Sequence, residues 1–599
     1  MGIGRKPPMG LALALLLAAS IAAAGSDEWV DDLTPIAASD WNRGRAAHLL
    51  ERAGFGGSPQ EVESFARLTP ERAVERVLHG EPGDLPGFEP SGVHDPSLEP
   101  FPPSRPATTA LARETGEAIG VRVKPVGNRR LQPVVNRFFY WLRASYLETN
   151  RLAYWWAQRM LTSGWPLQEK LALFWHGHFA TSETKVRDYR KMERQLALFH
   201  RHGSGNFREL LIAVSQDPAM LSFLDAGINV KGAANENFAR EIMELFTMGV
   251  GNYSETDIRE AARAFTGWNY VDLEFVVNAD RHDDGPKTVL GRTGDFDGVD
   301  VIGIILEQPV TAEFIAAKLY RYFVREELSP GLKQRLGARL RESGYEITPL
   351  LRTLFLSKDF YSRASVAAQI KSPVQLVVST YRKLGLRELP GVPDFNDATS
   401  ELGQQLFRPP TVAGWPSGRA WVTPGLLLAR GNFAYDVLFP DINFIPHDRY
   451  PRDFRIRAVS EKIAQGADIT NATIPADGSQ MSMANVIADR DEDFNTRYGS
   501  YKGWQQAIQR VKPIPRTTAA VRLREMSLAA GLETTTQAVD YLLARFLVVP
   551  PDPEFRRELI RYLDSELGTS SLARARSYLE EPLRRVVHLI LSSPAYQLG

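Results

Sequence analysis

Apolar residues recur every three or four positions along most of the chain, which is the spacing of a helix that buries one face. From Val134 onward they form a long stripe whose members are Leu142, Tyr146, Leu152, Trp155, Trp156 and Met160. The same spacing returns in three stretches within residues 206–270, again over 312–386, and finally over 506–599. The pattern predicts a mainly α-helical protein that folds as one large multi-helical body, with irregular loops and minor β structure.

Residues with strong preferences for helix ends indicate where several of these helices begin. Ser58-Pro59-Gln60-Glu61 is a capping box with proline at the first helical position, and it follows a short predicted helix over residues 45–53. Thr69-Pro70 begins another helix, predicted over 71–78, and Pro166 begins a third.

Three segments lack the helical pattern. Eight prolines fall within residues 80–106, which predicts an irregular surface segment. Residues 275–303 are rich in glycine and aspartate, and we expect a loop there with one or two short strands. Residues 440–505 are polar and irregular. The expected organisation is a signal peptide over 1–24, a linker over 25–39, a helical core over 40–440, a polar insert over 441–505, and a C-terminal helical segment over 506–599 that packs on the core.

The N-terminus has the three parts of a secretory signal peptide. Arg5 and Lys6 give a basic start, residues 11–24 are uncharged and rich in alanine and leucine, and Ala22-Ala23-Ala24 supplies small residues for cleavage. We therefore expect an exported protein, periplasmic or extracellular; the alternative is an N-terminal membrane anchor. No later stretch reaches about 18 uncharged apolar residues, so we expect no permanent membrane span.

Composition and charge exclude several classes of protein. Apolar residues make up 44% and charged residues 24% of the 599 positions, as in soluble globular proteins. Lys and Arg together number 71, as do Asp and Glu, so no bulk positive charge favours a nucleic-acid partner. Cysteine is absent, which excludes disulfides, iron–sulfur clusters and zinc sites made of thiolates. A transition metal would need ligands from His, Asp, Glu or Asn.

The first candidate site is the run 174–179, in which His176 and His178 flank Gly177. Two histidines at i and i+2 do not share a helix face. They can share one side of an extended chain, which the glycine permits. The pair can then chelate a divalent ion if a third ligand comes from elsewhere. The alternative is that the two rings close the end of the preceding helix.

The second candidate is an amphipathic helix for which Asn235 is a suitable N-cap. Glu236, Arg240, Glu241 and Glu244 share its polar face, and Arg240 is four positions from both Glu236 and Glu244. This face is either a solvated surface with a ladder of ion pairs or the wall of a cleft, in which Glu236 and Glu241 ligate a metal or transfer protons.

The third candidate is the acidic loop 280–287. Its acids alternate as in a calcium-binding loop, but His282 occupies the third ligand position and glycine the twelfth, so the EF-hand match fails. His282 and Asp283 can instead complete a metal site begun by His176 and His178. The alternative is an ordinary surface turn.

Several segments spread over residues 40–597 resemble the bacterial family called domain of unknown function 1800. These segments are 46–56, 174–179, 217–220, the helix beginning at 235–237, 264–268, 282–288, 371–374, 407–416 and 592–594. The resemblance implies an exported, mostly helical bacterial protein that accompanies another exported family with a sulfatase-like fold. It implies no particular reaction and no catalytic residues.

Two hypotheses follow for function. In the first, His176, His178 and His282 hold a zinc-like divalent ion, and Glu236, Glu241 or Asp283 acts as a further ligand or a base. Water bound to that metal would hydrolyse a bond in an envelope or extracellular substrate such as a polysaccharide. In the second, the protein is a non-catalytic helical scaffold that binds another exported protein or a surface polymer, and the same side chains form buried polar networks. Convergence of the three segments on one cleft favours the enzyme, and their dispersion favours the scaffold.

Overall fold

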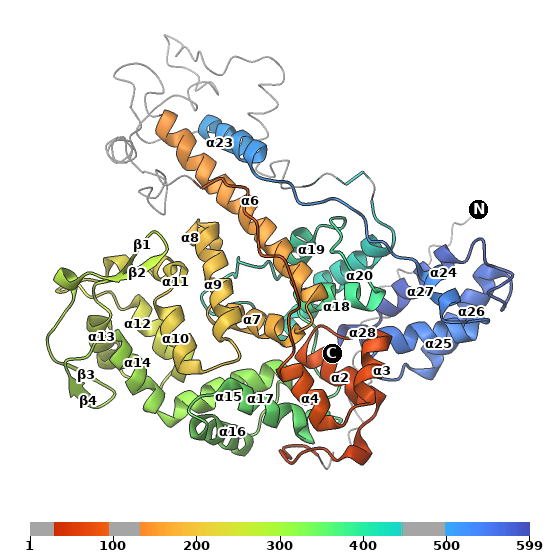
Figure 1. The fold of residues 1–599 in the computed structure, drawn as a ribbon, viewed down its shortest axis with the longest axis horizontal. Helices are drawn as coiled ribbons and strands as arrows, with labels where there is room; N and C mark the ends of the chain where they lie inside the picture. Colours follow the sequence, from red (N-terminus) through yellow and green to blue (C-terminus); the bar gives the residue numbers. More distant parts are fainter. Residues whose placement is uncertain (1–28, 95–131, 442, 445, 447–496) are drawn as a thin grey trace, which may run out of the picture.

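A computed structural model describes residues 29–94, 132–441, 443–444, 446 and 497–599 (Figure 1). The predicted signal peptide and most of the predicted polar insert lie outside these residues. The described chain is mainly α-helical, as the sequence predicted, and its only strands form two small two-stranded sheets.

Of the three N-terminal helices, the second and third begin at the predicted signals, and the first begins at Arg43, two residues before its predicted start. They are α2 (Arg43–Ala53), α3 (Pro59–Ala66) and α4 (Pro70–Leu78). At the start of α3, the Ser58 hydroxyl accepts from the Glu61 backbone N–H, and the Glu61 carboxylate accepts from the Ser58 N–H, so the capping box is confirmed. Thr69 caps α4 by accepting from the Arg72 N–H.

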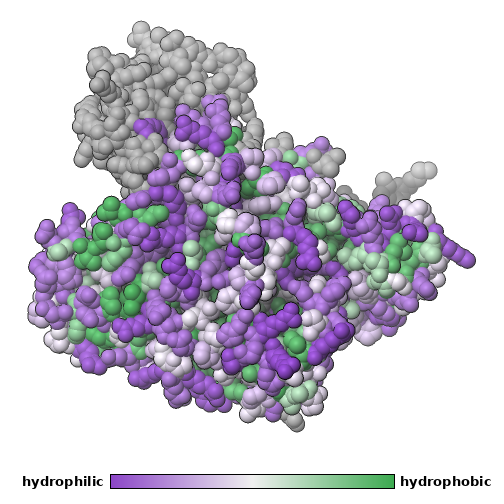
Figure 2. Space-filling model, viewed as in Figure 1, coloured by the Kyte–Doolittle hydropathy of each residue, from purple (hydrophilic) through white to green (hydrophobic). Residues whose placement is uncertain are grey.

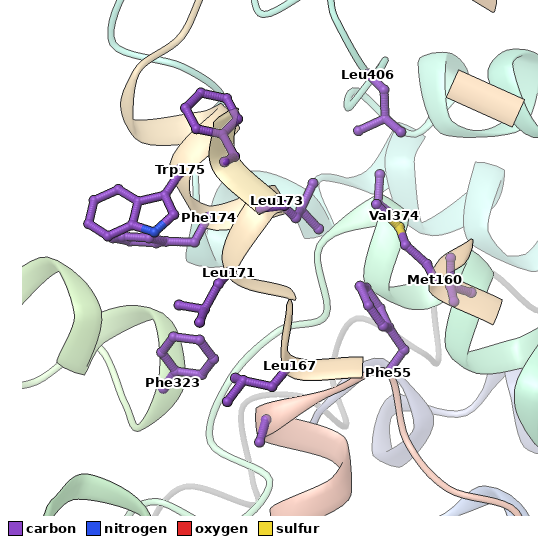
Figure 3. Close-up of a cluster of buried hydrophobic side chains, with 14 of the residues drawn as sticks. Phe55, Met160, Leu167, Leu171, Leu173, Phe174, Trp175, Phe323, Val374 and Leu406 are labelled. Carbon is purple, nitrogen blue, oxygen red and sulfur yellow. The ribbon is translucent and has the colours of Figure 1, made fainter. Parts of the chain in front are cut away.

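Helix α7 (Pro166–His178) lies at the centre of the molecule and is buried on nearly every side. Ten of its thirteen residues are buried, which is the state of a helix inside a core. Figure 3 shows Leu167 and Leu171 of α7 near Phe323, and Leu173 near Val374. The helices that come before and after it in the chain are α6 (Gln132–Thr162), α8 (Glu183–Val186), α9 (Tyr189–His202), α10 (Phe207–Ser215) and α11 (Pro218–Phe223).

The small lobe at the left of Figure 1 carries both sheets. Its elements are η3 (Ala226–Ile228), α12 (Asn237–Met243), the π-helical segment η4 (Glu244–Met248), α13 (Glu255–Ala264), β1 (Trp268–Val271), β2 (Glu274–Val277), η5 (Ala279–Arg281), β3 (Lys287–Val289), β4 (Arg292–Gly294) and α14 (Gly298–Glu307). Both sheets are antiparallel hairpins, with Trp268 opposite Val277 and Lys287 opposite Gly294. The predicted C-terminal bound of the loop over 275–303 is wrong. Asp297 caps α14, and the helix begins at Gly298.

The remaining helices complete the body. They are α15 (Pro309–Phe323), α16 (Pro330–Glu342), α17 (Ile347–Leu356), α18 (Pro373–Leu384), α19 (Phe395–Glu401), α20 (Pro424–Leu438), α23 (Arg497–Arg510), α24 (Leu523–Ala529), α25 (Thr535–Phe546), α26 (Pro553–Leu567), α27 (Glu580–Ser592) and α28 (Pro594–Gln597); short 3-10 turns are η1 (Ala38–Asp40), η6 (Asp359–Tyr361) and η7 (Gly418–Val422). Helix α23 begins before the expected end of the insert at residue 505. The C-terminal helix α27 contacts α20, and α25 contacts α18.

Hydrophobic side chains of the described residues gather in two clusters that share no buried member, although the partly buried Phe88 packs against both. The larger one extends from Ile36 to Tyr596 and joins helices from the whole chain. The smaller one lies where α23 runs beside α6, and its buried members are Val93, Tyr140, Ala144, Leu147, Tyr189, Ala507 and Val511 (Figure 1). Among the described helices, none combines the length and the apolar character needed to cross a membrane.

Candidate functional site

Both histidines of the first candidate lie in the last turn of α7. The helix continues through His178, so the expectation that an extended chain turns the two rings to one side is wrong. Residues two apart on a helix point to nearly opposite sides. Accordingly, His176 and His178 make their polar contacts with segments that are far apart in sequence.

His176 is a buried, neutral hydrogen-bond acceptor. Its Nε2 accepts from the backbone N–H of Phe407 at 2.9 Å. Aromatic rings surround it, with centroids at 5.6 Å for Trp156, 5.0 Å for Phe407 and 5.2 Å for Trp415. Burial lowers the pKa of His176 to about 3. The Nε2 lone pair that could bind a metal is therefore occupied by a backbone N–H.

The loop that receives His176 is held in an unusual conformation. Phe407 has φ of 61°, a left-handed backbone that costs a bulky residue free energy. Its N–H is held by His176, and its carbonyl accepts from the Glu183 N–H at 2.9 Å. Further along, Gly414 has φ of 83°, and a Cβ there would collide with the Gly177 carbonyl oxygen. The loop 407–416 thus docks directly on the end of α7.

His178 is also buried and neutral, but it is a donor. Its Nε2 lies 3.0 Å from the Phe246 carbonyl oxygen, which can only accept, so this nitrogen carries the proton. Phe246 belongs to the π-helical segment η4, and Thr247 Oγ1 donates to the Ile242 carbonyl in the same turn. Burial lowers the pKa of His178 to about 3, and the charge of Lys318 contributes. His178 therefore anchors the π turn to α7.

The acidic helix face pairs differently from the predicted ladder. Arg240 binds Glu236 at 3.2 Å as predicted, but its second partner is Glu255 at 2.7 Å. The predicted pair with Glu244 is wrong, because the π turn begins at Glu244 and its carboxylate accepts from the Tyr253 hydroxyl at 2.6 Å. Burial and the neighbouring Glu244 raise the pKa of Glu241.

The start of this helix also differs by one residue from the prediction. Glu236 occupies the N-cap position of α12, without a side-chain cap bond. Asn235 still contributes, since its side-chain oxygen accepts from the Asn237 backbone N–H at 2.9 Å.

The loop with His282 and Asp283 is fastened to the end of α13. His282 Nδ1 donates to the Thr266 carbonyl at 2.9 Å, and the Asp283 N–H donates to the Thr266 hydroxyl at 2.8 Å. The Asp283 carboxylate binds the Arg263 guanidinium through two contacts, at 2.8 and 3.2 Å. Mainly through these hydrogen bonds, Arg263 lowers the pKa of Asp283 to about 2. Asp283 is therefore an ion-paired carboxylate.

The three candidate segments do not assemble a metal centre among the described residues. No group of three or more His, Asp or Glu side chains in that part of the chain is placed to hold one ion. His176, His178, His282 and Asp283 each engage a protein group instead. Metal binding by this protein stays a prediction.

Comparison with known proteins decides the family. Residues 48–598 match the family described as protein of unknown function DUF1800, which is nearly the whole chain. The chain belongs to the DUF1800 family. No curated protein and no solved structure matches it. The match confirms the resemblance seen in the sequence segments, and the family description names no reaction.

Sequence reasoning missed a deeply buried group of charges in this DUF1800 protein. Glu51 is 1% exposed, and its carboxylate binds Lys383 at 2.8 Å and Lys371 at 3.5 Å. A third lysine, Lys170, reaches the same group through Gln375. The segments 46–56 and 371–374, both part of the family resemblance, meet here. The only local signal was a glutamate close to the buried apolar positions of α2.

A second missed group surrounds Asp217. This residue is 2% exposed, and its Oδ2 accepts from Gln195 Nε2 at 2.9 Å and from the Met220 N–H at 3.2 Å. Its Oδ1 is buried without a hydrogen-bond partner in the described structure. Burial raises the pKa of Asp217 to about 7. In the sequence, residues 217–220 stood out only as one of the segments of the family resemblance.

Proposed function

We propose that this DUF1800 protein is exported and acts as a non-catalytic helical scaffold that binds another exported protein. The observation that carries the proposal is the state of the histidines at the end of α7. His176 and His178 are neutral, buried among aromatic rings, and hydrogen-bonded to the backbone of Phe407 and Phe246. Such contacts fix three segments of the chain to one another, which is a structural role.

The candidate carboxylates also support a scaffold over a metal-dependent enzyme. Asp283 is bound to Arg263, and Glu236 to Arg240. A carboxylate in a two-contact pair with arginine is a poor base because its pKa is low, and it ligates a metal only after the arginine is displaced. Metal-dependent hydrolysis would therefore require Asp283 and both α7 histidines to leave their present partners.

A surface suited to a partner protein lies on the β1–β2 hairpin. Ile228 and Val271 are 64% and 67% exposed, and we call these two residues the hairpin patch. Val277 is 52% exposed, but it pairs with Trp268 and so lies on the opposite face of the hairpin from Val271. Residue 228 lies in η3, which contacts β1. Figure 2 shows apolar surface over this hairpin, rimmed by hydrophilic residues. An exposed apolar group with a polar rim is typical of a protein–protein contact.

The first test separates the scaffold from the metal-dependent hydrolase. The purified protein is incubated with Zn²⁺, dialysed, and its metal content measured beside the His282→Ala variant. The scaffold predicts no stoichiometric metal in either protein, and no turnover of chromogenic ester, glycoside or phosphate substrates. One bound ion per chain that is lost in His282→Ala would instead establish the metal site.

The second test measures partner binding. The protein is mixed with an exported protein of sulfatase-like fold, the companion that the family resemblance implies, and complex formation is followed by size-exclusion chromatography. We expect Ile228→Asp and Val271→Asp to weaken the complex at least about tenfold, since each places a charge in an apolar contact. Val250→Asp is the control, because Val250 is 76% exposed but lies outside the hairpin patch. Equal binding by all three variants would refute the hairpin patch as the contact.

A further inference from the structure

Lys170 and Gln375 meet in the interior between α7 and α18. Both residues are 4% exposed, and they are 205 positions apart in sequence. The Lys170 Nζ contacts the Gln375 carboxamide oxygen directly. The rings of Phe55 and Tyr322 lie 5.0 and 5.6 Å from the same Nζ. The amine and the carboxamide are thus held together in surroundings that exclude water.

The charges nearby leave the Lys170 amine without a counter-ion of its own. Glu51 is the carboxylate of this group, and it is already paired with Lys371 and Lys383. Among the described residues, Lys170 has no ion-pair partner. Burial, with the charge of Arg52, lowers the pKa of Lys170 well below its usual value. A lower pKa makes the uncharged form of the amine, which is the nucleophilic form, easier to reach.

The other end of the carboxamide is held by Glu51. The Gln375 Nε2 donates to the Glu51 carboxylate at 3.2 Å and to the Glu51 carbonyl at 3.3 Å. Burial raises the pKa of Glu51, but Lys371 and Lys383 together lower it further, so the group is a carboxylate. Glu51 is therefore a positioning residue, which fixes the Nε2 end of the carboxamide while the oxygen end meets Lys170.

From this juxtaposition we propose that Lys170 and Gln375 become joined by an intramolecular isopeptide bond. The Lys170 Nζ attacks the Gln375 side-chain carbonyl carbon, and a new C–N bond forms. The surplus proton of the attacking nitrogen passes to Nε2, the nitrogen that leaves. The bond between the carbonyl carbon and Nε2 breaks, and ammonia leaves. An amine and a primary amide become a secondary amide and ammonia, without any oxidant or added reagent.

The fixed arrangement supplies what the reaction needs. Holding the two reacting groups together removes most of the entropic cost of bringing them into contact. The product would tie α7 to α18 covalently, in a chain that has no cysteine and therefore no disulfide to perform that function. It also replaces a buried primary amine by an amide, which is cheaper to bury.

Mass spectrometry of the folded, purified protein tests the proposal. We expect the chain to be lighter than its sequence mass by about 17 Da, the mass of the ammonia released when the amine displaces it. Trypsin should fail to cleave after Lys170 and should give peptide 160–185 joined to peptide 372–382. Cleavage after Lys170, with a free peptide 372–382 of unchanged mass, would overturn the proposal.

Variants identify the two reacting groups and the residue that positions them. Lys170→Arg and Gln375→Met should each restore the full mass. Glu51→Leu, which can no longer hold Nε2, should reduce the linked fraction at least about tenfold, whereas Glu51→Gln keeps an acceptor for Nε2 and should stay mostly linked. Lys191→Met is the matched control, because Lys191 is also a buried lysine, 6% exposed, but lies outside this charge group, so the chain should stay linked. A mass deficit that persists in Lys170→Arg would assign the loss of ammonia elsewhere and contradict the proposal.

Discussion

The backbone N–H of Phe407 donates to Nε2 of His176 at 2.9 Å, across 231 positions of sequence. Because Phe407 has a left-handed backbone, this bond holds a residue in a conformation that it would otherwise avoid. The bond exists only while Nε2 carries no proton. The stability of the loop 407–416 is thus coupled to the ionisation of one ring in α7.

Replacing His176 by phenylalanine should therefore destabilise the protein. The aromatic packing is largely kept, but the Phe407 N–H loses its acceptor inside the core, which costs about 1–3 kcal/mol. Chemical unfolding measures the change. His79→Phe is the control, because the His79 side chain is 59% exposed. Equal losses in the two variants would show that the His176 bond contributes nothing.

The buried histidines should make the protein acid-sensitive. Burial lowers the pKa values of His48, His176 and His178 from 6.5 to about 3. Below pH 6.5 the unfolded chain binds protons that the folded protein does not bind. The free energy of unfolding due to the neutral rings is fully present above pH 6.5 and is lost as pH falls towards 3. Each ring lowers this free energy by up to about 1.4 kcal/mol per pH unit.

Urea unfolding between about pH 7 and pH 4 measures this slope. His178→Gln should flatten it, since an amide N–H can still donate to Phe246 and does not titrate. An unchanged slope in His178→Gln would mean that His178 is protonated within the folded protein.

Asp217 should have the opposite effect on the pH dependence of stability, because its contribution is lost as pH rises. Its pKa is raised from 3.8 to about 7, so the folded protein binds a proton that the unfolded chain releases. The stability from the protonated acid is complete below pH 3.8 and is lost as pH rises through 7. Asp217→Asn keeps an acceptor for Gln195 and the Met220 N–H but cannot ionise.

We therefore expect Asp217→Asn to be more stable than the parent protein at about pH 8, by on the order of a few kcal/mol, and to lose this advantage at about pH 4. Thermal unfolding at both pH values measures the difference. Asp284→Asn is the control, because that side chain is 73% exposed. The prediction fails if the advantage of Asp217→Asn is the same at both pH values.

Gly414 and Gly232 form a matched pair for testing how closely the loop 407–416 approaches α7. Their φ angles are 83° and 80°, but a Cβ on Gly414 would collide with the Gly177 oxygen, whereas a Cβ on Gly232 meets nothing within 4 Å. Gly232→Ala should cost about 1–2 kcal/mol from backbone strain alone. Gly414→Ala should cost several kcal/mol more and lower the melting temperature further; similar losses would show that the loop can move away.

Local features were predictable from the sequence, and long-range ones were not. The capping box at Ser58 and the cap at Thr69 involve residues three apart, so the sequence itself contains both partners. The π turn at Glu244 is held by the contact between Phe246 and His178, which are 68 positions apart, and helical spacing alone predicted a regular ladder.

The candidate site illustrates the same limit. The sequence identified His176 and His178 as unusual, but their roles depend on Phe407 and Phe246, which only the fold brings near. Lys371 offered no signal of its pairing, because its partner Glu51 lies in α2, far earlier in the chain. Residue type and spacing indicate possible chemistry, and packing decides which groups remain available for it.

The smaller hydrophobic cluster between α6 and α23 implies that the protein has more than one cooperative unit. Its described buried members include Ala507 and Val511 from the C-terminal side, and none of them belongs to the larger core. Small clusters open with lower free energy than the main core. Amide hydrogens of α23 should thus exchange with deuterium well before those of α7, and this helix would detach and return while the rest of the molecule stays folded.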